Sequence, residues 1–262
     1  MIQITTAQWY AWIAAFIFPF LRVLGILLAD PLFGNRMTPL AAKVGLAIFV
    51  TLLLAPVLPP MPRVEPASAE GVLIAVQQLV IGLGMGFAVR IALTAAETAG
   101  QLAGLQMGLG FAVFFDPQSS AQTAVVGQFL GLFAILIFLS INGHFVVLSA
   151  LSESFHLLPV QLGPVDALGW RTLVEWGSVI FSAGVLISLP VVGALLIANV
   201  AVGVMSRAAP QLNVFAIGFP ITLVTGFIAL YLAVPYIGPA LTGLFEQAMF
   251  AVGRLLQDLA PR

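Results

Sequence analysis

The most prominent pattern in the sequence is a series of long stretches without a charged side chain. Residues 117–152, 176–206 and 208–245 contain no Asp, Glu, Lys or Arg. Each run exceeds the roughly 20 apolar residues that cross a bilayer as a helix. Proline-containing and polar turns separate these runs from further apolar stretches. The pattern predicts six long hydrophobic segments, at about 9–29, 39–58, 71 to beyond 97, 117–141, 176–205 and 214–234.

The chain from Gly238 onward has a different pattern. Apolar residues recur at helical spacing, opposite polar side chains such as Glu246 and Arg254. This pattern predicts a separate amphipathic C-terminal helix whose apolar stripe docks on partner helices or lies at a membrane interface. Residues 153–175, broken by Pro159 and Pro164, are expected to form a short amphipathic connection. The apolar stripe consists of Leu241, Leu244, Phe245, Ala248, Val252, Leu255, Leu256 and Leu259.

Composition assigns the pattern to a membrane protein. The 262 residues are 61% hydrophobic and 7% charged, whereas soluble domains carry roughly 25% charged residues. We therefore expect an all-α polytopic membrane protein built of helical hairpins, with one domain over residues 1–262. The N-terminus lacks a basic region, so the first apolar segment is expected to be retained. A net charge of −1 argues against nucleic-acid binding, which requires a basic surface.

The basic residues do not favour one side of the predicted membrane. Six alternating spans would place four of them on one side and three or four on the other. Simple multi-pass proteins show an excess of Lys and Arg on the cytoplasmic side. The segments are therefore not expected to cross the membrane as simple independent spans.

No residue pattern indicates catalysis, a cofactor or a metal. Gly82, Gly84 and Gly86 resemble a phosphate loop, but no Lys-Ser/Thr follows, so close helix packing is the better interpretation. His144 and His156 have no further ligand at metal-binding spacing. Cysteine is absent, which excludes thiolate ligands and a thiol nucleophile. We expect no enzymatic activity.

Three charged residues interrupt the apolar segments. Arg22 lies in the middle of the first segment, and Arg90 and Glu97 are seven residues apart in the third. A charge in the centre of a lone spanning helix costs on the order of 2.5–3.5 kcal/mol. Each of the three charged side chains is therefore expected to make a buried polar contact. For Arg22, the expected contact is a protein partner or a water-filled cavity. Arg90 and Glu97 could alternatively relay protons or ions.

The stretch from Gly100 to Pro117 combines close packing with flexibility. Small residues at 100, 104 and 108 share one helical face, as do Gly127 and Gly131 in the next segment. Gly108 and Gly110 then loosen the helix before a cluster of phenylalanines, and Asp116-Pro117 begins the next helix. The phenylalanines could be ordinary core, or they could form an apolar seal that closes a pore by excluding water. The cluster consists of Phe111, Phe114 and Phe115.

Four stretches, in this order along the chain, are similar to the FliR/SctT family of type III secretion export gate subunits. The similarity covers essentially the whole length, and the stretch around APQLNVF is its most specific part. The four stretches are FPFLRVLGILLADPLFG (18–34), GLQMGLGFAVFFDPQSS (104–120), FLSINGHFVVLSALSESFHLLP (138–159) and SRAAPQLNVFAIGFPIT (206–222).

This resemblance implies a function and partners. One such subunit joins several copies of FliP and FliQ around a channel for unfolded flagellar proteins, in an apparatus that also contains FlhB and FlhA. It implies a bacterial inner-membrane location in the flagellar basal body, with much of the assembly above the membrane plane. The corresponding subunit of a virulence injectisome and a secondary small-molecule transporter remain alternatives.

The resemblance also implies roles for particular residues. The loop from Gly108 to Asp116, including Gly110, Phe111, Phe114 and Phe115, corresponds to the plug that closes the family's channel. The polar turn at 207–213 corresponds to the family's polar turn, with a role in assembly. Its residues are Arg207, Pro210, Gln211 and Asn213.

Overall fold

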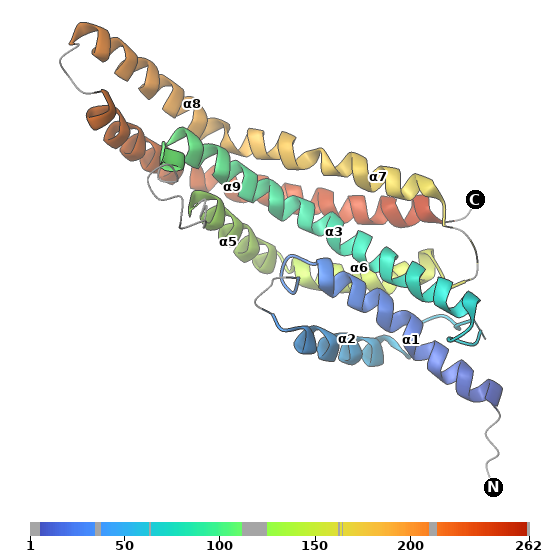
Figure 1. Ribbon diagram of the computed structural model, residues 1–262. Helices are drawn as coiled ribbons and strands as arrows, with labels where there is room; N and C mark the ends of the chain where they lie inside the picture. Colours follow the sequence, from blue (N-terminus) through green and yellow to red (C-terminus); the bar gives the residue numbers. More distant parts are fainter. Residues whose placement is uncertain are drawn as a thin grey trace. The chain divides into compact units, whose positions relative to one another are not determined.

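The computed structural model describes residues 6–34, 38–62, 64–111, 125–161, 163, 165–209 and 214–260. This part of the chain is helical and contains no strand, so the predicted all-α class is confirmed (Figure 1). The helices are α1 (Thr6–Ala29), α2 (Leu40–Leu54), α3 (Ala69–Gln106), the 3-10 turn η1 (Leu109–Phe111), α5 (Val125–Ser140), α6 (Gly143–Leu157), α7 (Ala167–Gly177), α8 (Val179–Ala208) and α9 (Val214–Leu259).

Four stretches of the described residues are long and apolar enough to cross a membrane. They are Gln8–Ala29, Ala69–Gln106, Ala167–Ala208 and Gly218–Leu259. Helices α5 and α6, separated by a short break, would count as a fifth if they form one broken span. The predicted polytopic membrane protein is consistent with these lengths and compositions.

The chain forms two compact units that alternate along the sequence. The first comprises Met1–Ile91, Asn142–Gly177 and Glu246–Arg262, and the second comprises Ala92–Ile141 and Ser178–Phe245. Whether the chain behaves as one domain over 1–262 therefore stays a prediction.

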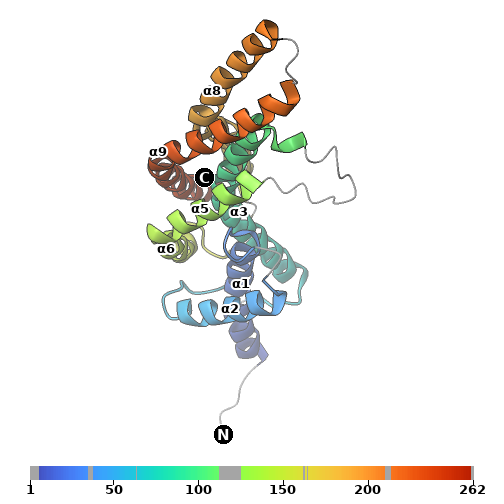
Figure 2. The same ribbon diagram turned by 90° about the vertical axis from the view of Figure 1, so that its left-hand side faces the viewer.

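In the first unit, glycines bring the backbones of α1 and α3 together. A Cβ atom added to Gly25 would lie 2.5 Å from the carbonyl oxygen of Leu79, and one added to Gly86 would lie 2.7 Å from that of Ile26. The helix-packing interpretation of the 82–86 glycines is thus confirmed at Gly86. Residues later in α1 contact residues later in α3, so the two helices run parallel. Helix α2 connects them and packs on α1 (Figure 2).

Two polar contacts attach α7 to the rest of the first unit. The indole Nε1 of Trp176 donates a hydrogen bond of 2.9 Å to the carbonyl of Ala88 on α3. The hydroxyl of Thr172 donates one of 2.6 Å to the carboxylate of Asp258 near the end of α9. Both contacts join residues that are more than 80 positions apart in the sequence.

In the second unit, α3 and α5 cross at the predicted small residues. A Cβ on Gly100 would lie 2.5 Å from the carbonyl oxygen of Val126 and 2.6 Å from Cα of Gly127. Only glycine permits this approach, so the predicted small-residue contact is confirmed here. One helical turn further along α5, Gly131 faces the side chain of Glu97.

The expected connection over 153–175 was partly wrong. Its first residues end helix α6, where Leu151, Ser154 and Phe155 are buried, and its last residues form α7. Pro159 lies just after the end of α6 and therefore does not interrupt it. The sequence pattern failed here because α6 is only 15 residues long and has mixed polarity.

The predicted separation of the last apolar segment from the amphipathic tail was also wrong. Helix α9 is continuous over 46 residues and contains Pro220, Pro235 and Pro239. Each proline removes one N–H donor, but the remaining hydrogen bonds carry the helix past it. All eight residues of the predicted apolar stripe are buried within the chain itself. Leu255 lies against Gly84 and Leu259 against Gly169, so these two residues need no partner protein for burial.

Candidate functional site

The most elaborate polar cluster of the first unit is centred on Arg22, in the middle of α1. Its side chain is 0% exposed. Nε donates a hydrogen bond of 2.7 Å to Oε1 of Gln78 on α3. Nη1 donates to the carbonyl and the hydroxyl of Ser154, at 2.8 and 3.1 Å, and Nη2 to the carbonyl of Leu158 at 2.8 Å. The guanidinium carbon lies 4.3 Å from the ring centroid of Phe155.

This cluster stabilises the charge of Arg22 through neutral groups. Ser154 is in the last turn of α6 and Leu158 is its C-cap residue, so the guanidinium binds carbonyls at the negative end of a helix dipole. The Phe155 ring adds a cation–π contact. Arg22 thereby joins α1, α3 and α6. The predicted need for a protein partner is met here by residues of the same chain.

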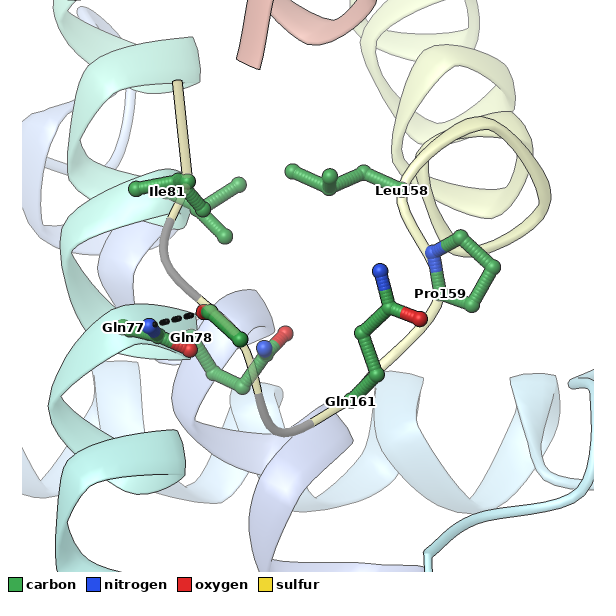
Figure 3. A pocket seen from close by; sticks show the side chains of 8 residues that line it. Gln77, Gln78, Ile81, Leu158, Pro159 and Gln161 are labelled. Atoms are coloured by element: carbon green, nitrogen blue, oxygen red, sulfur yellow. Dashed lines mark hydrogen bonds between the residues drawn. The ribbon is translucent and has the colours of Figure 1, made fainter. Parts of the chain in front are cut away.

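A polar pocket lies beside this cluster. Gln77 and Gln78 are adjacent on α3, and Nε2 of Gln77 donates a hydrogen bond of 2.7 Å to the carbonyl of Gly163 (Figure 3). The pocket has a volume of about 10 Å³, enough for roughly one water molecule. Its lining residues are Gln77, Gln78, Ile81, Leu158, Pro159, Gln161, Gly163 and Val165. It is too small to hold a substrate or cofactor.

A second cavity, of about 110 Å³, lies between α1, α2 and α6 and is almost entirely apolar. Its two titratable lining residues are Asp30 and His144. Oδ1 of Asp30 accepts hydrogen bonds from the backbone N–H groups of Leu32 and Phe33, at 2.8 and 3.2 Å. Burial raises the pKa of Asp30, and these two hydrogen bonds partly oppose that shift. Nδ1 of His144 is buried and has no hydrogen-bond partner among the described residues.

Neither cavity has the ligands of a metal site. Among the described residues, no group of three or more His, Cys, Asp or Glu side chains could hold a metal ion. Asp30 and His144 together supply only two such groups, in apolar surroundings.

The other two predicted polar contacts have different environments. Arg90 is exposed on the surface of α3. Glu97 is half-buried, and its side chain lies over Gly131 of α5, where an added Cβ would be 2.9 Å from Cγ of Glu97. Both residues make further interactions within the chain. Arg22, in contrast, is enclosed completely.

The predicted plug begins where α3 ends in the second unit. Gly108 has φ of 84°, a left-handed conformation that favours glycine and terminates helices. Its N–H donates a hydrogen bond of 3.1 Å to the carbonyl of Leu105. Leu109 to Phe111 then form the turn η1, which contains Gly110. Phe114, Phe115 and Asp116 lie outside the described residues, as does the side chain of Phe111.

The residue before this bend is firmly held. Met107 is fully buried, and its side chain packs against Gly226 of α9, where an added Cβ would lie 2.9 Å from the sulfur. The hydroxyl of Thr222 on α9 lies 3.4 Å from the Met107 carbonyl and closer, at 3.0 Å, to the carbonyl of Phe219 in its own helix. The predicted plug therefore starts from a fixed point on α9.

The predicted assembly turn is described only at its start. Arg207 lies exposed in the last turn of α8, where a positive charge is favoured by the helix dipole. Pro210, Gln211 and Asn213 lie outside the described residues.

Sequence reasoning missed the partners of the buried groups. Gln78 and Ser154 were not singled out, although an adjacent glutamine pair in an apolar helix is an informative signal. Met107 and Gly226 were missed because no local pattern connects residues 119 positions apart (226 minus 107).

Comparisons with known proteins identify the family of this chain. The profile of the family described as "Bacterial export proteins, family 1" matches residues 13–248. The chain is 38% identical over 259 residues to the flagellar biosynthetic protein FliR of Escherichia coli K12, covering 99% of both chains. It is 39% identical to FliR of Pectobacterium carotovorum, with 95% of both covered, and 29% identical to FliR of Bacillus subtilis, with 92% of this chain and 94% of that protein covered. The chain therefore belongs to family 1 of the bacterial export proteins.

Proposed function

We propose that this chain is a structural subunit of the flagellar type III protein export gate. In this proposal it forms, with FliP and FliQ, the channel through which unfolded flagellar proteins leave the cell. The near full-length similarity to proteins named flagellar biosynthetic protein FliR carries the proposal. The same similarity favours the flagellar apparatus over an injectisome.

The proposed location is the bacterial inner membrane at the flagellar basal body, in an apparatus that also contains FlhB and FlhA. Several long apolar helices support a membrane location. The proposed role is structural rather than catalytic. Arg22 supports this view, since its guanidinium binds carbonyl, amide and hydroxyl oxygens of the fold and is closed to any substrate.

The loop from Gly108 to Asp116 is proposed to plug the channel. A closed export channel must stop ions and yet open for a polypeptide, so its seal must be apolar and displaceable. Phe111, Phe114 and Phe115 supply the apolar bulk. The burial of Met107 and its packing on Gly226 of α9 support this role, because a movable seal needs a fixed base. Gly108, already in the left-handed conformation, provides a bend at that base.

The turn from Arg207 to Asn213 is proposed to contribute to assembly with the partner subunits. Arg207 is exposed at the end of α8 and is thus available to another chain. Exposed apolar side chains cover much of α8 and α9, including Phe181, Ile197 and Tyr231. These surfaces suit lipid or the helices of neighbouring subunits.

Deletion of Phe111–Phe115 tests the plug. A seal predicts that the export complex still assembles and that cells leak ions or small solutes. Ordinary core residues predict the opposite, because each truncated phenylalanine would cost roughly 3–5 kcal/mol of stability and the complex would be lost. Complex yield and membrane leakage are measured on the same strain.

A matched control keeps the apolar character of the loop. Replacing Phe111, Phe114 and Phe115 with leucine should preserve water exclusion and cause little leakage, whereas serine at the same positions should leak. Loss of assembly without leakage would contradict the plug. Normal flagellar export in a strain lacking the whole chain would contradict the broader proposal.

A further inference from the structure

The larger cavity of the first unit has the size and lining of a site for a small apolar molecule. It measures about 110 Å³ and lies between α1, α2 and α6. A cavity of about 150 Å³ with a similar aliphatic and aromatic lining stays dry and binds benzene. The cavity therefore has room for a single ring or a short alkyl chain. Its apolar lining residues are Val23, Ile26, Leu27, Leu32, Phe33, Leu46, Val50, Val147, Leu148 and Leu151.

The two polar lining residues, Asp30 and His144, lie at one end of the cavity. Arg22 of α1 binds Ser154 near the end of α6, whereas Asp30 follows the end of α1 and His144 is in the first turn of α6. The two helices are thus antiparallel here, and Asp30 lies roughly 12 Å further along α1 than Arg22. The cavity residues of α1 and α6 between these two levels are all aliphatic. The cavity is therefore apolar along its length and polar at the end away from Arg22.

The two polar groups differ in their hydrogen bonds. Oδ1 of Asp30 accepts from the backbone N–H groups of Leu32 and Phe33, and burial raises the pKa of this carboxyl, which favours its neutral form. Nδ1 of His144 is buried but has no hydrogen-bond partner among the described residues. A buried polar atom without a partner is costly, and a buried water molecule typically needs about three partners. The open position at the polar end is therefore the one at Nδ1 of His144.

We propose that this cavity binds a small uncharged molecule that combines a short alkyl chain or a single ring with one hydroxyl group. A hydroxyl both donates and accepts, so it can bind Nδ1 of His144 in either neutral tautomer. The apolar part of the molecule would fill the cavity toward Val23 and Leu151. Leu148 and Phe33 line the cavity and are 40% and 36% exposed, which gives the molecule an entrance beside them.

Other ligands fit this cavity less well. The end of a lipid acyl chain would fill the apolar part but has no group for His144. A charged head group would lose its hydration among aliphatic side chains, at a high cost in free energy. The proposed site does not depend on the proposed export function.

A photoreactive alcohol tests the site in the assembled complex. The full-length chain is purified with its co-assembling subunits, reconstituted in phosphatidylethanolamine–phosphatidylglycerol vesicles and irradiated with a diazirine derivative of hexanol. Mass spectrometry locates the attached label, with and without an excess of hexanol. Labelling of the cavity residues should saturate and be suppressed by hexanol, whereas labelling of lipid-facing residues should not. Cavity labelling that hexanol does not suppress, or no cavity labelling because a neighbouring subunit fills the space, would overturn the proposal.

The variant His144→Phe tests the hydroxyl contact, because it keeps a ring but removes the hydrogen-bonding nitrogen. Hexanol should compete roughly three- to tenfold less well in this variant, as expected for the loss of one hydrogen bond. Competition by hexane should not change. If the variant leaves competition by hexanol unchanged, His144 does not bind the hydroxyl and the proposed ligand class is wrong.

Neighbouring valines on α6 supply a matched pair of variants. Val147 lines the cavity, whereas Val146 is 43% exposed and does not line it. Val147→Phe should fill the cavity and abolish the labelling that hexanol suppresses, and Val146→Phe should preserve it. Val147→Leu adds only one methylene and should weaken the labelling in a chain that packs more normally. Co-purification of the other subunits shows that each variant still folds. Undiminished labelling in both Val147 variants would place the bound alcohol elsewhere and overturn the site.

Discussion

Nε of Arg22 donates a hydrogen bond of 2.7 Å to Oε1 of Gln78, a residue 56 positions later in the chain. Both side chains are buried, and the bond joins α1 to α3 where their backbones run parallel and close together. The same guanidinium binds the last carbonyls of α6. One side chain thus fixes the relative positions of three helices in the first unit.

Replacing Gln78 with leucine should destabilise the protein by roughly 1.5–3 kcal/mol, because the Nε donor of a buried cation loses its acceptor. Gln77→Leu is the matched control, since Gln77 is the adjacent residue and its bond to Gly163 joins neutral groups. Its loss should cost only about 1 kcal/mol. Thermal unfolding in detergent compares the two variants. Equal losses would argue against a special role for the Arg22 cluster.

Replacing Gly100 with alanine should destabilise the protein by roughly 1–3 kcal/mol, because the added Cβ would meet the backbone of Val126 at 2.5 Å. Gly193 on α8 is the control, since an added Cβ there meets nothing within 4 Å. Gly193→Ala should be neutral or stabilising by up to about 1 kcal/mol, owing to the better helix propensity of alanine. The midpoint of thermal unfolding in detergent measures both. A harmless Gly100→Ala would contradict the close crossing of α3 and α5.

Replacing Gly108 with alanine should cost roughly 1–2 kcal/mol, because φ of 84° is unfavourable for a residue with a Cβ. Gly108→Asn should recover part of the loss, since asparagine tolerates this conformation better. Both are compared by thermal unfolding of the purified complex. If the asparagine variant were no better than the alanine variant, the backbone conformation would not be the cause.

Asp30 should make stability depend on pH. A raised pKa means that the folded protein holds this proton more tightly than the unfolded chain, so stability falls as pH rises from the ordinary Asp value of about 3.9 through the raised value. Above that window the full penalty of the buried carboxylate remains. Asp30→Asn should remove this part of the pH dependence and keep an oxygen acceptor for Leu32 and Phe33. Unfolding midpoints between about pH 4 and 8 measure the slope, and an unchanged slope in the variant would contradict the assignment.

The sequence was most informative where a property is local. Long apolar stretches located α1, α3 and α8, and glycines four residues apart marked the crossing at Gly100, since both follow from the composition of a single helix. The sequence could not show that Arg22 binds Gln78 and Ser154, because those contacts depend on which helices become neighbours. It also wrongly ended a segment at about residue 234 and began a separate amphipathic helix at Gly238, although α9 continues through Pro235 and Pro239. A proline removes only one hydrogen bond, and the buried residues on both sides of these two hold α9 together.

The parallel arrangement of α1 and α3 requires the chain to travel back between them. Helix α2 has 15 residues and covers about 22 Å, whereas α1 has 24 residues and covers about 36 Å. The non-helical residues that follow α2, beginning with 55–62, must cover the rest of the distance back to the start of α3. In apolar surroundings every unbonded N–H group of such a segment is costly.

The composition of this return segment reduces that cost. Four of its eight residues, Pro56, Pro59, Pro60 and Pro62, have no N–H group to satisfy. Two others, Ala55 and Val57, donate to the carbonyls of Thr51 and Leu54, at 2.9 and 2.8 Å. Of the eight residues, only Leu58 and Met61 have amide hydrogens without an acceptor in the described part of the chain. Proline here serves as a residue without a donor, which lowers the number of N–H groups that the return segment must satisfy.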